Sequence, residues 1–150
     1  SYIFRFVSIL GPRYSHGHVY DFLKQLLKNK NHLEVLGDGN QKKSYLSVED
    51  CINAIWKAIN YFNEKVNIIN LGTAEYLNVK ASIEIICNVL DVKPKIIYKG
   101  GKRGWIGDNP FIFLDTKKIR KTGWKPKFTI KQSIEKTVKY IINNKWILKK

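Results

Sequence analysis

The 150-residue sequence contains no methionine, two cysteines and four prolines. Cys51 and Cys87 are too few for a disulfide framework, and together with the three histidines they show no spacing typical of a zinc site. Each cysteine lies among apolar residues of a predicted helix. We therefore interpret both as buried, reduced thiols and expect no bound metal.

Long apolar runs are missing as well. A membrane-spanning helix needs about 18 consecutive apolar residues, and no segment of this chain reaches that length. The start of the chain does not resemble a signal peptide, because Arg5 interrupts the first apolar stretch and no small-residue cleavage site follows. We therefore expect no membrane partner and a cytoplasmic location.

Glycine-rich nucleotide-binding loops are also absent. Neither Gly-x-Gly-x-x-Gly nor a P-loop follows a predicted strand. The nearest match, at residues 37–42, has lysine in the place of the third glycine. This chain is therefore not expected to hold a dinucleotide pyrophosphate by itself.

The chain begins at Ser1 and enters a predicted strand at once, without an initiator methionine. Two interpretations fit this beginning: the sequence is a piece of a longer protein, or processing removed the first residue. We expect the former, with further sequence upstream.

Acidic residues are scarce: 12 aspartates and glutamates stand against 27 lysines and arginines, which gives a net charge of +15. Such an excess is typical of proteins that bind nucleic acid or other polyanions. The basic residues are mostly lysines, however, and they are spread from end to end, as on an ordinary solvated surface. We do not expect nucleic acid to be a partner, but a stand-alone nucleic-acid-binding module remains the alternative function.

Hydrophobic periodicity indicates a mixed α/β fold without repeats or long linkers, and the length suits one domain or a large piece of one. Apolar runs predict strands, and apolar residues three or four positions apart predict helices between them. The expected strands are residues 3–9, 33–36, 44–48, 66–71 and 96–98. The expected helices are residues 19–27, 47–59, 78–90, 115–122 and 129–142.

Several helix ends carry recognisable signals. Ser47 and Thr129 each begin a capping-box pattern, in which a side chain three residues on answers the cap. Asn78 is typical of an N-cap, and Gly123 of the residue that ends a helix. Two tryptophans at positions 56 and 146 fall on predicted helices, and we interpret them as packing residues.

Two loops combine glycines with cations. Residues 37–43 read Gly-Asp-Gly-Asn-Gln-Lys-Lys, and residues 100–105 read Gly-Gly-Lys-Arg-Gly-Trp. Glycines let backbone N–H groups approach a phosphate, while lysine and arginine supply the countercharge. Arg103 is the strongest candidate, because its planar fork suits bidentate contacts. The loops predict a phosphate-binding site, although any lysine-rich protein has basic loops.

Tyr-x-x-x-Lys, a pairing in which lysine lowers the pKa of a catalytic tyrosine, occurs four times. The four tyrosines have no serine or threonine at a spacing that would support catalysis; they are Tyr20, Tyr61, Tyr76 and Tyr98. We expect no catalytic residue in this chain.

Five motifs in the same order resemble one enzyme family. They are Gly-Pro-Arg at residues 11–13, the glycine–lysine loop at 37–43 with Val-Glu-Asp at 48–50, Asn-Leu-Gly at 70–72, Arg-Gly-Trp-Ile-Gly-Asp at 103–108 and Gly-Trp-Lys-Pro at 123–126. Together they are similar to the C-terminal portion of extended short-chain dehydrogenases/reductases. This NAD-dependent epimerase/dehydratase group includes UDP-galactose 4-epimerase.

The resemblance implies that residues 1–150 are a C-terminal, substrate-binding domain fragment with a mixed α/β fold, lacking the N-terminal Rossmann core. An NAD-binding half and the catalytic residues would lie upstream of Ser1. The fragment alone would be inactive and would bind no cofactor, and its partner would be a nucleotide-sugar substrate. The full enzyme would be a homodimer, and the fragment a monomer.

The resemblance also implies roles for single residues. Lys43 and Arg103 take the places of two phosphate-binding arginines, although Lys43 would act as a point charge instead of a fork. Val35 and Leu36 fall where the family lines the nucleobase pocket, and Asp108 falls where an aspartate often contacts the ribose.

The chain also departs from the family pattern. Ser8 and Leu10 stand where the family usually has asparagine and tyrosine, on the sugar side of the site, and the loop at 103–108 is two residues longer than the common form. A third interpretation of the function is a degenerate, non-catalytic relative used for assembly.

Arg103→Ala in the full enzyme is expected to weaken nucleotide-sugar binding by about 1.5–3 kcal/mol, the range for a charge-assisted hydrogen bond. Calorimetric titration measures the change directly. A dissociation constant equal to that of the wild type would contradict the phosphate-binding role.

Overall fold

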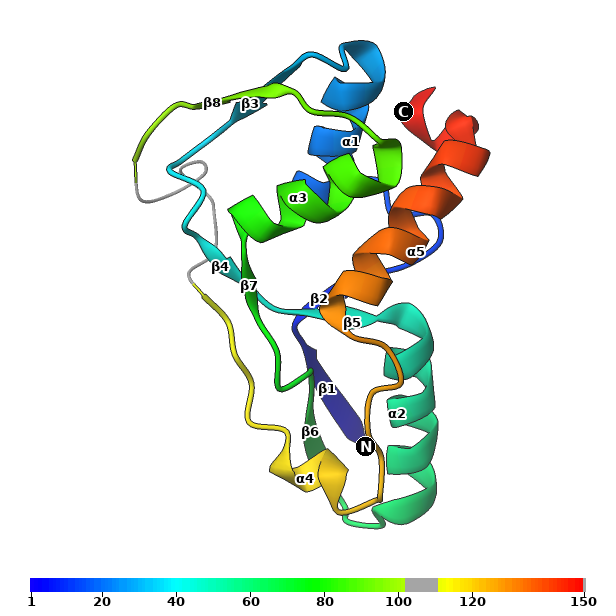
Figure 1. The fold of residues 1–150 in the computed structure, drawn as a ribbon. Coiled ribbons are helices and arrows are strands. Elements are labelled where there is room, and N and C mark those ends of the chain that lie inside the picture. Colours follow the sequence, from blue (N-terminus) through cyan, green and yellow to red (C-terminus); the bar gives the residue numbers. More distant parts are fainter. Residues whose placement is uncertain (102–110, 150) are drawn as a thin grey trace.

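The computed structural model describes residues 1–101 and 111–149 (Figure 1). Its strands are β1 (Tyr2–Phe6), β2 (Ser8–Leu10), β3 (His32–Val35), β4 (Lys42–Lys43), β5 (Tyr45–Ser47), β6 (Asn67–Leu71), β7 (Leu77–Asn78) and β8 (Lys95–Tyr98). Its helices are α1 (His18–Lys28), α2 (Val48–Tyr61), α3 (Val79–Leu90), α4 (Lys117–Arg120), α5 (Ile130–Asn143) and the 3-10 helix η1 (Lys145–Lys149). The mixed α/β fold expected from periodicity is confirmed.

The strands of the described residues pair two by two. β1 pairs with β6, β2 with β5 and β3 with β8, all parallel, whereas β4 and β7 are antiparallel. Parallel neighbours need long crossovers, and here helices lie within each of them. Figure 1 shows the β1/β6 pair beside α2 and α4 at one end of the molecule, and β3/β8 beside α1 and α3 at the other.

The single strand expected at residues 3–9 was wrong, because the chain changes partners at Val7. β1 runs along β6, the Val7 backbone N–H donates to the Leu71 carbonyl at 3.2 Å, and β2 then runs along β5. Val7 is buried and packs against Gly72, where an added Cβ would lie 3.2 Å from a Val7 methyl. The chain therefore leaves the β1/β6 pair and joins the β2/β5 pair at this residue.

One hydrophobic core lies among α1, α3 and α5 (Figure 1). The apolar stripes predicted for these helices are confirmed, since their central residues are fully or almost fully buried. They include Val19, Leu23 and Leu26 of α1, Ile83 and Ile86 of α3, and Ile134, Val138 and Ile141 of α5. We call this cluster the upper core.

A second core, the lower core, lies where α2 and α4 cover the β1/β6 pair. The residues that α2 buries there are small: Cys51, Ala54 and Ala58. Small side chains let a helix approach a sheet closely. The larger Ile52 and Ile59 of the same helix are exposed.

The packing roles expected for Trp56 and Trp146 were wrong. Trp56 is 68% exposed and Trp146 is 48% exposed. The tryptophan that fills the lower core is Trp124, which follows the helix-ending Gly123 and is 1% exposed. Because α2 packs through its small residues, Trp56 lies on the opposite side of the helix from the core.

The helix caps predicted at Asn78 and Thr129 are confirmed. The Asn78 side chain accepts from the Ala81 N–H at 2.8 Å. At α5, Thr129 accepts from the Gln132 N–H and Gln132 accepts from the Thr129 N–H, which makes a complete capping box. α4 itself ends at Arg120, and the turn after it closes at Gly123, whose N–H donates to the Arg120 carbonyl at 3.0 Å and whose φ is 71°.

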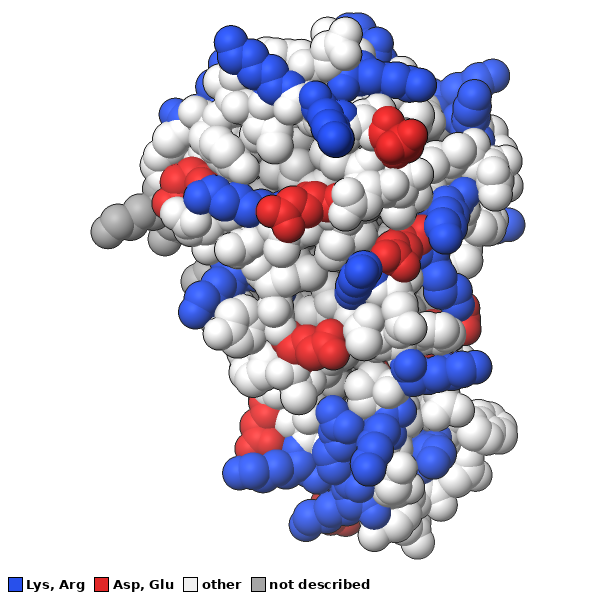
Figure 2. Space-filling model, in the orientation of Figure 1, with Lys and Arg blue, Asp and Glu red and all other residues white. Residues whose placement is uncertain are grey.

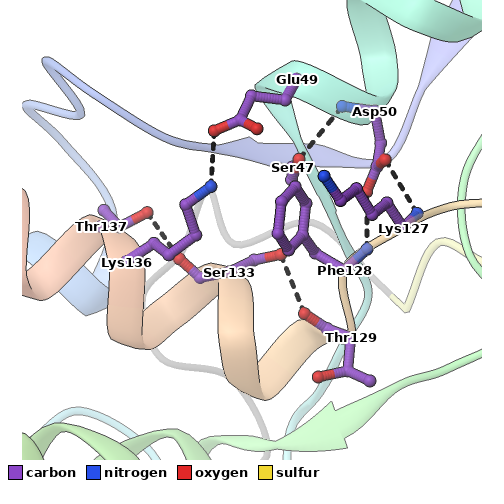
Figure 3. A network of polar contacts seen from close by, with 9 residues as sticks. All are labelled: Ser47, Glu49, Asp50, Lys127, Phe128, Thr129, Ser133, Lys136 and Thr137. Atoms are coloured by element: carbon purple, nitrogen blue, oxygen red, sulfur yellow. Dashed lines mark hydrogen bonds and ion pairs between the residues drawn. The ribbon is translucent and has the colours of Figure 1, made fainter.

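The capping box predicted at Ser47 is only half formed. Ser47 accepts from the Asp50 N–H at 3.1 Å, but the Asp50 carboxylate does not answer it. It accepts instead from the N–H groups of Lys127 and Phe128, at 2.8 and 3.1 Å (Figure 3). Asp50 thus joins the start of α2 to the segment that leads into α5.

Both cysteines are buried and unpaired with each other, as predicted. Cys51 lies in the lower core and Cys87 in the upper core. Burial raises the pKa of both thiols, so both remain protonated and unreactive at neutral pH.

Basic side chains are distributed widely over the surface (Figure 2). Figure 2 shows them interspersed with acidic side chains on the face drawn, with a denser group at the α4 end. In α4, three of four residues are basic. Most of the charge is therefore spread out, as the sequence indicated. In the part of the chain that the structure describes, no helix combines the length and apolar character needed to cross a bilayer.

Asp50→Ala is expected to lower the free energy of unfolding by about 2–3 kcal/mol, because it leaves two backbone donors without their charged acceptor. The matched control is Glu49→Ala, which removes only the exposed ion pair with Lys136 and is expected to cost less than about 1 kcal/mol. Thermal and urea unfolding of the full-length protein measure both. Equal effects of the two substitutions would contradict the role of Asp50.

Candidate functional site

The first predicted loop forms a tight turn against the end of β8. Gly37 and Gly39 have positive φ angles of 85° and 77°, in the region that glycine adopts without strain. Gly37 pairs with Gly100, whose N–H donates to the Gly37 carbonyl at 3.2 Å. A Cβ on Gly39 would lie 2.4 Å from the Tyr98 ring, so no other residue fits there.

The polar residues of this turn hold one another in place. The Asp38 carboxylate accepts from the Asn40 backbone N–H at 2.8 Å and from its side-chain amide at 3.1 Å. The Asn40 side-chain oxygen accepts from Lys80 Nζ at 3.0 Å. The hydrogen bonds from Asn40 lower the pKa of Asp38, and the nearby Lys80 adds to the effect. The turn is thus anionic at its tip and anchored to α3.

Gln41 closes the turn on its inner side. Its Nε2 donates to the Leu36 carbonyl at 3.4 Å, and its backbone carbonyl accepts from the Val79 N–H at 3.1 Å. Its side-chain Oε1 is buried and has no hydrogen-bond partner among the described residues. The turn from Leu36 to Gln41 is therefore held from both ends.

The predicted nucleobase residues differ in exposure. Val35, the last residue of β3, pairs with Tyr98 and is completely buried in the upper core. Leu36 is 58% exposed at the entrance of the turn. Of the two side chains, Leu36 is the one that a ligand can contact without any rearrangement.

Lys43, the predicted phosphate cation, is the last residue of β4 and lies opposite Leu77 of β7. It is partly buried and has interactions within the chain. The other two predicted residues, Arg103 and Asp108, lie outside the described residues.

Residues on both sides of the segment 102–110 contact the turn and β4. Gly100 pairs with Gly37, and the Phe111 ring lies 5.9 Å from Lys42 Nζ. The described residues on either side of the segment 102–110 therefore lie beside the turn and β4, about sixty positions away in the chain.

The structure adds a tyrosine–histidine pair that sequence reasoning missed. Tyr45 lies two residues beyond Lys43, pairs with Ser8 across the β2/β5 sheet and is buried. Its hydroxyl is 2.9 Å from Nδ1 of His18, the first residue of α1. These residues are 27 positions apart in the sequence, and the contact joins β5 to the start of α1.

Tyr14 and Asp21 lie close to the start of α1. Burial, together with the nearby Asp21 charge, raises the pKa of Tyr14 to about 12. Burial also raises the pKa of Asp21, against the opposing effect of Lys24 and His16. Tyr14 is therefore held as a neutral phenol, the opposite of what a tyrosinate base requires.

The Tyr-x-x-x-Lys pair at Tyr20 has a structural role. The Tyr20 hydroxyl donates to the Ile147 carbonyl at 3.1 Å in a buried position, and Lys24 lies over its ring. Tyr20 thereby fastens α1 to the C-terminal η1.

Comparison with known proteins identifies the family. A model of the NAD dependent epimerase/dehydratase family matches residues 1–72. A protein of Methanocaldococcus jannaschii, provisionally named a UDP-glucose 4-epimerase, is 31% identical over 146 residues, which are 95% of this chain. This chain belongs to the NAD dependent epimerase/dehydratase family. The resemblance drawn from the five motifs is confirmed.

Other members of the epimerase/dehydratase family agree. dTDP-glucose 4,6-dehydratase 1 of Escherichia coli is 29% identical over 125 residues, covering 77% of this chain and 34% of the relative. The crystal structure of a UDP-galactose 4-epimerase superposes with a TM-score of 0.81 at 31% identity, over 97% of this chain and 46% of that one. The chain spans 46% of the archaeal relative as well, so it corresponds to about half of these proteins.

Asp38 is expected to titrate below an ordinary aspartate, because both hydrogen bonds from Asn40 favour its charged form. Since the pKa is lowered in the folded protein, the turn has its full stability above the ordinary aspartate pKa. It loses this stability as the pH falls through the lowered value. Carbon-detected NMR titration of the carboxyl group, with hydrogen exchange at the Asn40 amide, measures both effects.

Asn40→Ala provides the control, since it removes one of the two hydrogen bonds and should move the Asp38 midpoint upward. A midpoint at or above that of an exposed aspartate in the unaltered protein would show that the turn does not hold the carboxylate in this way.

Proposed function

We propose that residues 1–150 form the C-terminal, nucleotide-diphosphate-sugar-binding part of an NAD-dependent epimerase/dehydratase, and that this part does not catalyse alone. One observation carries the proposal. The fold matches about half of a UDP-galactose 4-epimerase at 31% identity, while the sequence has no dinucleotide-binding loop.

The β1/β6 pair supports the proposal that the protein has a second domain. Parallel sheets are ordinarily covered on both faces and rarely occur as isolated pairs. Among the described residues β1 pairs on one edge only, and its Ile3 and Phe6 side chains are exposed. A further domain that adds strands beside β1 would complete the sheet and cover these side chains.

NAD would belong to that second domain. The described residues provide no glycine-rich cradle after a strand that fits a dinucleotide, since the turn at Gly37 runs into β4 instead of a helix. We therefore derive no redox step from this chain, and its own part would be to bind and orient the substrate.

The nucleotide-sugar would be gripped by the turn and the segment that flanks it. Leu36, with Val35 behind it, would contact the base, and Lys43 and Arg103 would bind the diphosphate from two sides. Asp108 would contact the ribose. Two or three charge-assisted bonds of about 1.5–3 kcal/mol each would supply much of the roughly 8 kcal/mol of a micromolar affinity.

The choice among epimerase, dehydratase, decarboxylase and reductase would lie in the other half, together with the catalytic residues. We propose a homodimeric, cytoplasmic enzyme in which dimer contacts come from that half, so that the part described here is monomeric by itself.

The high positive charge supports the alternative of nucleic-acid binding. Its strongest local sign is the basic group around α4, which includes Lys117, Lys118 and Arg120 (Figure 2). Lys118 is paired with Glu64, however, and Arg120 lies over the Trp124 ring. Nucleic-acid binding would require affinity that falls steeply with salt.

Lys43→Ala in the full-length protein is expected to weaken the binding of a nucleotide-diphosphate-sugar, with UDP-glucose and dTDP-glucose as probes, by about 1.5–3 kcal/mol. Lys43→Arg should preserve binding, because a planar fork also suits a diphosphate. Lys57→Ala, at an exposed position of α2, is the matched control and should change nothing. Calorimetry with each probe gives the dissociation constants.

Either of two results would contradict the proposal: no nucleotide-diphosphate-sugar binds the unaltered protein, or Lys43→Ala and Lys57→Ala bind it equally well. Tight binding of an oligonucleotide with a steep salt dependence would then favour the alternative.

A further inference from the structure

A cluster of aromatic rings with one cation lies on the outer side of the β4/β7 pair. Tyr76 precedes β7, and Phe111 and Phe113 come from the segment that leads toward α4. The Tyr76 ring meets Phe111 at 5.2 Å and Phe113 at 6.1 Å, and the two phenylalanine rings lie 5.7 Å apart. We call these three rings and Lys42 the aromatic cluster.

The cluster lies on the opposite face of β4 from Lys43. Successive side chains of a strand point to opposite faces. Lys42 pairs with Asn78, so it shares a face with Tyr76, two residues earlier, whereas Lys43 shares the other face with Leu77. Leu77 packs against the upper core. The aromatic cluster is therefore separate from the diphosphate site proposed above and is inferred independently of it.

The rings are exposed although they touch one another. Tyr76, Phe111 and Phe113 are 51%, 41% and 48% exposed. Isolated exposed apolar side chains are ordinary, but a contiguous group marks a surface that contacts something else. The nearly parallel rings of Phe111 and Phe113, 21° apart, offer adjoining apolar faces.

Polar groups at the edge of these ring faces limit the kinds of ligand that the surface could bind. Lys42 Nζ lies 4.8 Å from the centre of the Tyr76 ring and 5.9 Å from that of Phe111, held by cation–π attraction. Among the described residues, no carboxylate lies within ion-pair distance of it, and the Tyr76 hydroxyl has no hydrogen-bond partner. One cation and one hydroxyl thus border an apolar ring surface.

We propose that the aromatic cluster binds a sugar that carries a carboxylate or a phosphate. The C–H face of a pyranose would stack on Phe111 and Phe113, its hydroxyls would bond the Tyr76 hydroxyl, and its anionic group would pair with Lys42. The rings, the hydroxyl and the cation of the surface would thus each contact a different part of the sugar. The ligand could be a free sugar acid or sugar phosphate, or the end of an acidic polysaccharide.

The neighbouring lysines on β4 provide the test. Glucuronate, glucose 1-phosphate and a glucuronate-containing oligosaccharide are titrated into the full-length protein, with inorganic phosphate as an anion without a ring. Calorimetry gives affinities, and amide NMR shifts at Lys42, Tyr76 and Phe111 locate the binding.

Lys42→Ala is expected to weaken binding about tenfold, in line with a charge-assisted contact, and Tyr76→Leu about fivefold, in line with an aromatic contact. Lys43→Ala should leave this binding unchanged, although it is expected to weaken nucleotide-sugar binding. The thermal midpoint of each variant checks that it is folded. A polysaccharide source predicts that the oligosaccharide binds more tightly than glucuronate, and a free sugar predicts equal affinities.

Three results would overturn the proposal. The sugars do not bind; they bind equally to the Lys42→Ala and Tyr76→Leu variants; or inorganic phosphate binds as tightly as glucose 1-phosphate, which would mean attraction by charge alone. Loss of sugar binding in the Lys43→Ala variant only would place the ligand at the diphosphate site and would also exclude the aromatic cluster.

Discussion

The hydrogen bonds of the Asp50 carboxylate are the contact on which the two-core arrangement depends. Asp50 begins α2, the helix that covers the lower core, and accepts from the backbone of Lys127 and Phe128, which lead into α5 of the upper core. Two further contacts lie beside it (Figure 3). The Lys136–Glu49 ion pair joins α5 to α2, and Lys136 Nζ lies over the Phe128 ring. Because two small cores share few side chains, a buried anion that satisfies two backbone donors fixes their relative position better than apolar contact alone. The β2/β5 pair contributes to both cores, with Leu10 and Tyr45 in the upper core and Leu46 in the lower core.

The candidate site lies close to this junction, where β4, β5 and the start of α1 come together. β5 ends at the cap of α2, so the position of Lys43 and Tyr45 follows from that of Ser47 and Asp50. The turn from Leu36 to Gln41 is then fixed by contacts with α3 and β8. The antiparallel β4/β7 pair has a further consequence: Lys43 shares a face with Leu77, whereas Lys42 lies beside exposed aromatic rings on the other face.

Local signals accounted for much of the fold. The stripes of α1, α3 and α5, the caps at Asn78 and Thr129 and the stop at Gly123 depend on residues within a few positions of one another, so they can be read from the chain directly. Three expectations failed for a common reason. The break of the first strand at Val7, the outward orientation of Trp56 and the use of Asp50 by a distant backbone all depend on which segment packs alongside. Trp124 and Trp56 look alike as isolated aromatic residues, and only the close approach of α2 through its small residues decides which one is buried.

By itself, the sequence determined the helices, their buried faces, the glycine turn and, through its ordered motifs, membership of the epimerase/dehydratase family. It also indicated Lys43 as a candidate cation, because Lys43 lies four positions after Gly39 in a glycine-containing loop. Only the tertiary structure decided which residues from distant segments meet: Tyr45 with His18, Gly37 with Gly100, and Lys42 with Tyr76 and Phe111. The physical reason is that periodicity and capping are short-range effects of backbone geometry. Strand register and helix packing instead depend on the shapes and charges of surfaces brought together by the whole chain.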